Sequence, residues 1–277
     1  MKTSWPRRLA LVVGLVLLAG VAWVLRGAFG GPSEDPTVAP RCLAVRCGGE
    51  VLACLRDPEC KAWLDCMQEC GGEKMRCPTF CGAYYQSPTV SAFTQCGLQK
   101  RCIQVEFEGL PACATPATPR IPLEDVDGTW WVAAIKGWDY VLFDDCQKFV
   151  FETLGPGQVR ARNSVPLTRN GETRVCRNDG RYTRTPSGMM QLVYENWNGY
   201  REEWSYAWRS ENSLLAHVCS AGGPGASHDY GTFVLSRVPL TELPAGEHAA
   251  LERALRELYH LELGDLTLLK TTGCANQ

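Results

Sequence analysis

Histidine is scarce in this chain: only four of its 277 residues are histidine, and none occurs before His217. The segment from Arg41 to Cys113 holds eleven of the fifteen cysteines and therefore contains no histidine. A Cys–His zinc site needs histidine, and a four-cysteine zinc site needs thiolates in a reducing compartment. We therefore interpret this segment as a disulfide framework without a metal.

The sequence also lacks an excess of charge of either sign. It contains 28 Lys and Arg residues and 30 Asp and Glu residues, which gives a formal net charge of −2. The Cys-rich segment itself has eight basic and eight acidic residues. This balance excludes a basic nucleic-acid-binding patch, so we expect no nucleic-acid partner.

The N-terminus has the pattern of an export signal. Lys2, Arg7 and Arg8 precede a 17-residue apolar run, Leu9 to Leu25. Such a run suits a cleaved signal peptide or a transmembrane signal anchor, and both alternatives stay open. Either one places the rest of the chain in an oxidising compartment, such as the periplasm, the exterior or a membrane lumen. A nearby lipid surface is then an expected partner.

Composition divides the chain into five parts, which differ in cysteine, proline and aromatic content. They are a signal peptide or signal anchor with its tether (1–40), a Cys-rich disulfide domain (41–108), a Pro-rich linker (109–123), a β-domain (124–240), and a C-terminal helix with its tail (241–277).

Cysteine spacing predicts how the Cys-rich domain is cross-linked. Cys66 and Cys70, like Cys77 and Cys81, are four residues apart, so on a helix both sulfurs of each pair share one face. Two antiparallel helices would then form Cys66–Cys81 and Cys70–Cys77.

The same outer-and-inner arrangement upstream suggests two further nested disulfides, Cys42–Cys60 and Cys47–Cys54. Cys96 and Cys102 are expected to pair locally, and Cys113 is left over. Spacing alone is compatible with many pairings.

The β-domain contains eight short strand-like runs separated by turn residues, including Gly155-Pro156-Gly157, Asn170-Gly171, Asn178-Asp179-Gly180 and Asn198-Gly199. The runs are 125–135, 147–154, 158–165, 173–177, 190–195, 202–209, 213–219 and 231–238. This pattern predicts an up-and-down antiparallel barrel or a sandwich. Residues 243–261 then read as an amphipathic helix with Leu251, Leu255, Leu258 and Tyr259 on one stripe.

The run from Tyr200 to Arg209 alternates between an aromatic and a polar face. The aromatic face carries Tyr200, Glu202, Trp204, Tyr206 and Trp208, whereas Glu203 lies on the opposite face. We expect the aromatic face to line the domain interior and Glu203 to face water. Burial among aromatic rings should raise the pKa of Glu202 and allow its carboxyl group to donate a proton.

Gly128-x-Trp130 at the head of the first strand resembles the signature of lipocalins, with Arg237 at the end of the last strand. This resemblance implies that the arginine stacks on the tryptophan at the closed end of an eight-stranded antiparallel barrel. The expected fold class is therefore mainly β, a lipocalin-like barrel with a C-terminal helix, preceded by a small α-helical, disulfide-linked Cys-rich domain.

The joint pattern over residues 42–275 resembles the violaxanthin de-epoxidase family. The resemblance is carried by the cysteine spacing from Cys42 to Cys102, by Phe143-Asp144-Asp145-Cys146-Gln147, by Tyr200-Arg201-Glu202-Glu203-Trp204 and by Thr271-Thr272-Gly273-Cys274. It implies a Cys146–Cys274 disulfide. Cys176 and Cys219 are additional, and they would pair if their strands were adjacent.

The resemblance implies an oxidoreductase that reduces an apolar, carotenoid-like (xanthophyll-type) epoxide, with ascorbate as co-substrate and no bound cofactor. Glu202 would be the catalytic acid, where the family has aspartate. The expected substrate-binding residues are Asp145, Gln147, Tyr200, Trp204, Tyr206 and Tyr230. In a photosynthetic cell the compartment would be the thylakoid lumen.

This chain also departs from the family. Lys148, Phe149 and Val150 follow the Asp-Cys-Gln element where de-epoxidases place a histidine, and the family's pocket tyrosines are not matched at Cys219, Ser220, Leu235 or Ser236. Two alternatives therefore stay open: a non-catalytic lipocalin that carries an apolar ligand, and an interaction protein whose Cys-rich module binds a partner.

Overall fold

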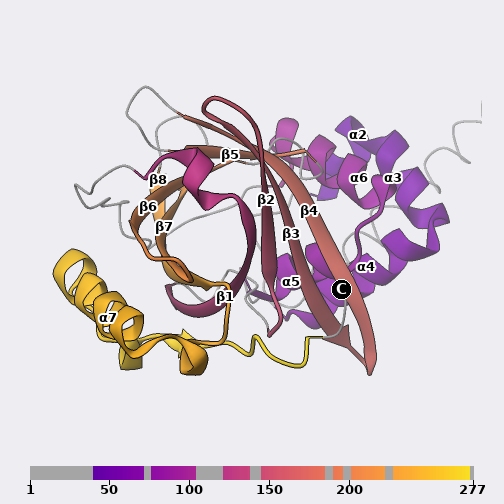
Figure 1. Cartoon of the computed structure of the whole chain (residues 1–277). Helices are drawn as coiled ribbons and strands as arrows, with labels where there is room; N and C mark the ends of the chain where they lie inside the picture. Colours follow the sequence, from indigo (N-terminus) through magenta and orange to yellow (C-terminus); the bar gives the residue numbers. More distant parts are fainter. Residues whose placement is uncertain are drawn as a thin grey trace, which may run out of the picture. The chain divides into compact units, whose positions relative to one another are not determined.

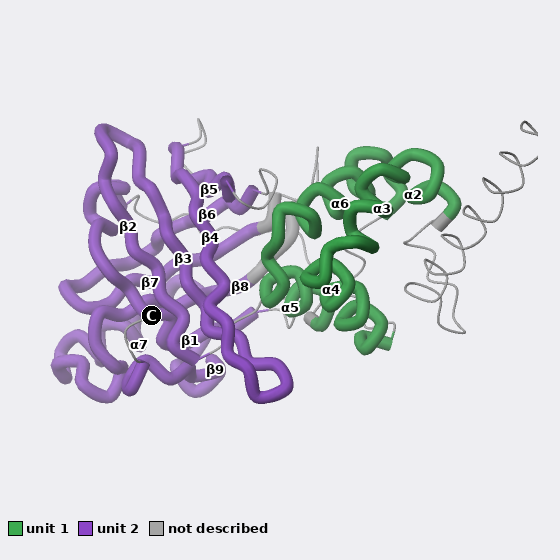
Figure 2. The backbone as a smooth tube through the Cα atoms, turned by 90° about the vertical axis from the view of Figure 1, so that its right-hand side faces the viewer, with its two compact units in different colours: residues 1–106 green, residues 107–277 purple. Residues whose placement is uncertain are grey.

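The computed structural model describes residues 40–71, 76–103, 121–137, 145–184, 190–195, 201–221 and 227–274. The chain divides into two compact units, residues 1–106 and residues 107–277 (Figure 2). Each unit is described below by itself. The expected signal segment and most of the Pro-rich linker, including Cys113, lie outside the described residues.

The first unit is helical. Its helices are α2 (Pro40–Arg46), α3 (Gly48–Arg56), α4 (Pro58–Glu69), α5 (Arg76–Tyr84) and α6 (Pro88–Gln99). Asp57 and Ser87 cap α4 and α6 through side-chain hydrogen bonds to backbone N–H groups, and a proline follows each cap. Trp63 and Phe93 pack edge to face in the small core, with ring centroids 5.5 Å apart.

The predicted α4–α5 hairpin is confirmed with both of its disulfides, Cys66–Cys81 and Cys70–Cys77. Cys146–Cys274, which the family resemblance implied, is also present.

The other pairings predicted within the Cys-rich domain are wrong. Cys42 pairs with Cys102, Cys47 with Cys96, and Cys54 with Cys60. The physical reason is that α3 ends at Arg56 and α4 begins at Pro58, so Cys54 and Cys60 flank a tight corner. Helix α3 packs on α6, and this packing brings Cys42 and Cys47 close to the C-terminal end of α6, where Cys96 and Cys102 lie.

The second unit is an antiparallel barrel, seen in Figure 1 as the ring of strands. Its strands are β1 (Gly128–Gly137), β2 (Lys148–Gly155), β3 (Gln158–Arg169), β4 (Glu172–Arg184), β5 (Met190–Tyr194), β6 (Arg201–Arg209), β7 (Ser213–Ala221) and β8 (Ser227–Ser236). Each strand pairs with the next, and β1 pairs with both β2 and β8, which closes the barrel. The predicted fold class is confirmed, and the sandwich alternative is wrong.

Trp130 and Arg237 close one end of the barrel. The Trp130 ring is fully buried, its Nε1 donates to the Val126 carbonyl at 2.7 Å, and the Arg237 guanidinium lies 4.2 Å from the ring centroid. Gly128 has φ of +103°, and a Cβ there would lie 2.9 Å from an Arg237 nitrogen. Glycine at this position therefore leaves room for the stacked arginine.

One predicted turn is wrong. Asn178, Asp179 and Gly180 lie inside β4, which runs without interruption from the Asn170–Gly171 hairpin turn to Arg184. Gly180 serves packing instead, because a Cβ on it would lie 2.6 Å from Leu192 Cδ1 and 2.9 Å from the Val193 carbonyl oxygen. The turn at residues 155–157 is confirmed, and Asn198–Gly199 lies outside the described residues.

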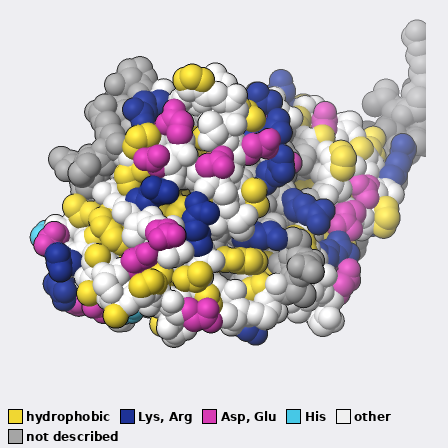
Figure 3. Space-filling view, viewed as in Figure 1, with side chains coloured by type: hydrophobic (Ala, Val, Ile, Leu, Met, Phe, Trp, Pro, Cys, Tyr) yellow, Lys and Arg dark blue, Asp and Glu magenta, His cyan; other side chains and the backbone are white. Residues whose placement is uncertain are grey.

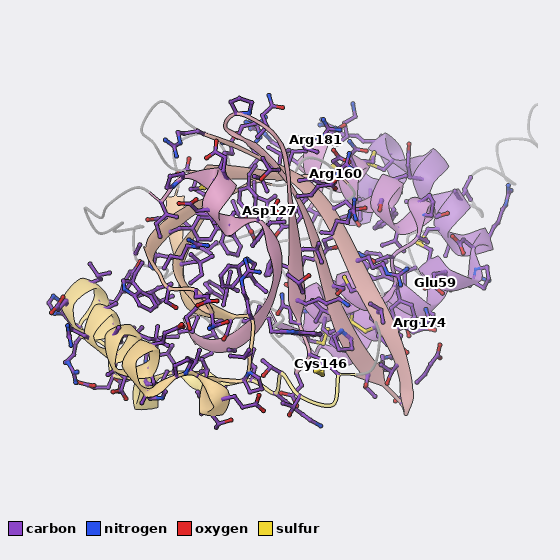
Figure 4. The ribbon with its side chains drawn as sticks, viewed as in Figure 1. Glu59, Asp127, Cys146, Arg160, Arg174 and Arg181 are labelled. Carbon is purple, nitrogen blue, oxygen red and sulfur yellow. A yellow bond between two sulfur atoms is a disulfide. The ribbon has the colours of Figure 1, made fainter. Side chains whose placement is uncertain are left out.

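Helix α7 (Ala245–Tyr259) packs on the outer face of β6 and β7 (Figure 1). The predicted apolar stripe is confirmed, since Leu251 and Leu255 are fully buried and Leu258 and Tyr259 pack beside them. The short strand β9 (Thr267–Leu268) then pairs with β1. Cys146, labelled in Figure 4, holds the tail that follows.

Cys176 and Cys219 do not pair with each other. Cys176 is a free, buried thiol, whereas Cys219 is disulfide-bonded. Their strands are not adjacent, because β4 pairs with β3 and β5, and β7 pairs with β6 and β8.

Basic and acidic side chains are interspersed on the face shown in Figure 3, as the balanced composition predicts. Within the described ranges, which begin at Pro40, no helix has the length and hydropathy needed to span a bilayer.

The close approach at Gly180 yields a stability test. Gly180→Ala should destabilise the full chain by roughly 1–3 kcal/mol, because the new methyl group meets backbone as well as side-chain atoms. Gly155→Ala is the matched control, since a Cβ at Gly155 meets nothing within 4 Å. Chemical denaturation measures both variants, and equal midpoints for the two would contradict the packing role of Gly180.

Candidate functional site

Strand β6 carries the candidate catalytic residue into the barrel. Glu202 is 9% exposed and pairs in register with Leu192 of β5, whereas Glu203 on the opposite face is only half-buried. Trp204 and Tyr206 belong to the interior apolar cluster of the barrel. The structure therefore brings these three side chains to one interior face, as the alternation predicts.

The alternation breaks after Tyr206. The pairing of β6 with β7 shifts between Tyr206 and Trp208, which leaves Ala207 as an extra residue. Trp208 consequently packs against the apolar cluster between α7 and the outer face of the barrel. The prediction that Trp208 lies on the interior face is wrong.

Two hydrogen bonds hold the Glu202 carboxyl group in place. Tyr194 Oη donates to Glu202 Oε2 at 2.8 Å, and Trp204 Nε1 donates to the same oxygen at 2.9 Å. Burial raises the pKa of Glu202 from 4.5 to about 7, although both hydrogen bonds act to lower it. Glu202 can therefore exchange a proton near neutral pH.

Sequence reasoning missed Tyr194. It stands in a predicted strand, but nothing in its local sequence indicates a carboxylate partner. The signal lies in the strand pairing: Leu192 pairs with Glu202, which places Tyr194 diagonally across from the carboxyl group. Only the register of β5 against β6 reveals this contact.

Aromatic rings fill the barrel beneath Glu202. Trp204 contacts Phe149 edge to face at 5.4 Å and stacks on Phe233 at 5.7 Å, measured between ring centroids. Figure 4 shows side chains occupying the ring of strands. The rings form an apolar floor for any ligand that approaches Glu202.

Gln147 lies at the same end of the barrel as Glu202. Gln147 lies just before β2, two residues ahead of Phe149, and Glu202 lies two residues ahead of Trp204 on β6. The rings of Phe149 and Trp204 are in contact. Gln147 is 2% exposed, and its Nε2 donates to Asn163 Oδ1 at a long 3.4 Å. Its Oε1 has no partner among the described residues.

The interior holds further polar groups. Cys176 Sγ donates to Asn178 Oδ1 at 3.5 Å, and burial raises the pKa of this thiol to about 12, which makes it unreactive. The hydroxyl groups of Tyr182 and Tyr206 are both buried and lie close enough to interact with each other. Burial raises the pKa of both tyrosines. Sequence reasoning identified Tyr206 but not the others.

Of the remaining expected substrate-binding residues, the structure describes the side chain of Asp145 alone, and it places Asp145 elsewhere. Asp145 is exposed, and its Oδ1 accepts a hydrogen bond from the Lys270 backbone N–H at 2.8 Å. It thus binds the C-terminal tail beside the Cys146–Cys274 disulfide, away from the interior. Tyr200 lies outside the described residues, and of Tyr230 only the backbone is described.

Comparison with known proteins identifies the family of this chain. A family model described as the VDE lipocalin domain matches residues 39–240, more than half of the chain. The chain belongs to the VDE lipocalin family. The violaxanthin de-epoxidase resemblance is thereby confirmed at the level of the family.

Curated relatives of this VDE lipocalin are chloroplastic violaxanthin de-epoxidases. The Arabidopsis thaliana protein is 26% identical over 46% of this chain, and the Nicotiana tabacum protein is 25% identical over 47%. These matches cover only 29% and 28% of the relatives' own lengths. A solved lobster apocrustacyanin A1 is 14% identical, with a TM-score of 0.43 over 60% of this chain and 93% of its own.

The raised pKa of Glu202 predicts a pH-dependent stability. The folded state binds this proton more tightly than the unfolded state, so the stabilising effect is complete below pH 4.5 and is lost as the pH rises through about 7. The loss from this group should be roughly 3 kcal/mol. Denaturation of the wild type at pH 4 and pH 8 measures it. Glu202→Gln should lack this component, and an unchanged pH dependence in that variant would contradict the assignment.

Proposed function

We propose that this protein reduces an apolar, xanthophyll-type epoxide with ascorbate, and that Glu202 is the proton donor. The observation that carries the proposal is a carboxyl group with a pKa of about 7, buried in a barrel whose interior is aromatic. An epoxide opens when its oxygen is protonated, and a donor with a pKa near the working pH is the most effective.

The reaction balances with the groups named. The epoxide oxygen takes a proton from Glu202 as one carbon–oxygen bond breaks. Two electrons and a second proton come from ascorbate as the second carbon–oxygen bond breaks, and the products are an alkene, dehydroascorbate and water. Glu202 then recovers its proton from solvent. Tyr194 and Trp204 orient the carboxyl group, because both donate to its Oε2, and we assign the transferred proton to Oε1.

Several contacts support binding of a ligand with a polar end group. The aromatic floor of Phe149 and Trp204 would receive its apolar ring. Gln147 Oε1 has no described partner and could accept a hydrogen bond from a ligand hydroxyl group. We also propose that the ligand is carotenoid-like and arrives from a lipid surface, in an oxidising compartment such as the disulfides require.

A second candidate is a carrier that binds the apolar ligand without turnover. It is favoured by the absence from this sequence of the histidine and pocket tyrosines expected from the family. Incubation of the purified protein with violaxanthin, ascorbate and a galactolipid separates the two candidates. De-epoxidised product supports the enzyme, and bound but unchanged carotenoid supports the carrier. If the carotenoid is neither converted nor bound, both candidates are contradicted.

A pair of neighbouring glutamates provides the matched test of the acid. Glu202→Gln should lower turnover at least ~100-fold, because the amide keeps the shape of the side chain but cannot supply the proton. Glu203→Gln should change little, since Glu203 faces outward. Carotenoid binding should survive in both variants, because the aromatic residues supply most of the contact. Full turnover in Glu202→Gln would refute the mechanism.

A further inference from the structure

Two disulfides of the helical unit lie in contact with each other. Cys66–Cys81 and Cys70–Cys77 both join α4 to α5. The Sγ atoms of Cys70 and Cys81, which belong to different disulfides, are only 3.8 Å apart. The Cys77 sulfur lies within 4.8 Å of both, and this is the one such cysteine cluster found in the described part of the chain.

The two disulfides differ in accessibility. Cys70 and Cys77 are half-buried, whereas Cys66 and Cys81 are 3% and 0% exposed. A thiol reagent therefore meets Cys70–Cys77 first, since exchange requires access to a disulfide sulfur.

We propose that these four cysteines form a thiol–disulfide exchange site, in which Cys70 relays the opening of the accessible disulfide to the buried one. A thiolate of a dithiol reductant attacks Cys77 Sγ, and Cys70 leaves as a thiolate. Cys70 then attacks Cys81 Sγ, which forms Cys70–Cys81 and releases Cys66 as a thiolate that takes a proton from solvent.

The second thiol of the reductant completes the balance. It attacks the mixed disulfide at Cys77, so that the reductant departs as an internal disulfide and Cys77 becomes a thiol. Two electrons have entered the protein, and the products are the Cys70–Cys81 disulfide with free thiols at Cys66 and Cys77.

The local backbone suits this step. The two sulfurs must approach by about 1.8 Å to reach bonding distance. Cys70 is the C-terminal capping residue of α4, followed by Gly71 in the left-handed region at φ of +59°. A side chain at a helix end has more room to move than one inside the helix.

The consequence is a helical hairpin that stays closed during partial reduction. After exchange, one disulfide still joins the end of α4 to α5. Free thiols remain at Cys77 and at Cys66, and Cys66 is on the buried face that also carries Trp63 and Leu64. Mild reduction would thus loosen α4 without separating the two helices.

The most direct test removes Cys77, the residue to which Cys70 is normally disulfide-bonded. In the full-length Cys77→Ser variant, Cys70 is left as a thiol beside Cys81. Alkylation followed by non-reducing peptide mapping should find two populations of molecules. In one, Cys70 is linked to Cys81 and the label is on Cys66; in the other, the original Cys66–Cys81 disulfide remains. Label on Cys70 alone, with Cys66–Cys81 intact from pH 7 to pH 9, would overturn the proposal.

Cys96→Ser is the matched control, because it frees Cys47 from a disulfide that belongs to no three-sulfur cluster among the described residues. We expect label on Cys47 only, and at least about tenfold less label on Cys66 than in Cys77→Ser. If a variant fails to fold, limited reduction of the wild type by dithiothreitol, followed by the same alkylation and mapping, tests the proposal instead. Label on Cys66 and Cys77 together supports the relay, whereas label on Cys70 and Cys77 together contradicts it.

Discussion

Closure of the sheet by β1 is the constraint on which the second unit depends. This strand pairs with β2 and β8 at once, so the barrel has an interior that strand pairing separates from solvent. Arg237 stacked on Trp130 covers one end, and Gly128 makes that contact possible because it lacks a Cβ. An open sheet with the same strands would leave Glu202 in water with an ordinary pKa.

The chemistry of the site follows from that closure. Burial disfavours the charged carboxylate of Glu202, while the hydroxyl group of Tyr194 and the indole N–H group of Trp204 favour it. Burial is the larger effect, and the balance leaves the pKa near neutrality instead of far above it. Strand β6 therefore supplies the acid, Glu202, and also Trp204, which donates a hydrogen bond to it and belongs to the aromatic interior of the barrel.

The sequence predicted what depends on local pattern and missed what depends on register. Strand alternation placed Glu202 inside and Glu203 outside, and the i, i+4 cysteines gave the α4–α5 hairpin. The bulge at Ala207, the contact with Tyr194 and the uninterrupted β4 at Gly180 all depend on which residues face each other across strands. A single sequence does not contain that information directly.

The same distinction explains the disulfides. The two pairs within the α4–α5 hairpin were predicted correctly, whereas the local pair Cys54–Cys60 was missed, and Cys42–Cys102 and Cys47–Cys96 join segments 60 and 49 residues apart. They form because α3 packs on α6, and nothing in the cysteine spacing encodes that packing. Asp145 was assigned to the substrate site through the family resemblance, whereas its hydrogen bond is to the C-terminal tail.

The central claim is that the barrel holds one carboxyl group poised to give up a proton near neutral pH. Carbon-13 NMR of protein labelled at the glutamate side-chain carboxyl groups, titrated from pH 4 to pH 9, tests it most directly. The account predicts one signal with a midpoint near 7 that is missing from Glu202→Gln. If every glutamate titrates near its ordinary value and no neutral midpoint is found, the account is wrong.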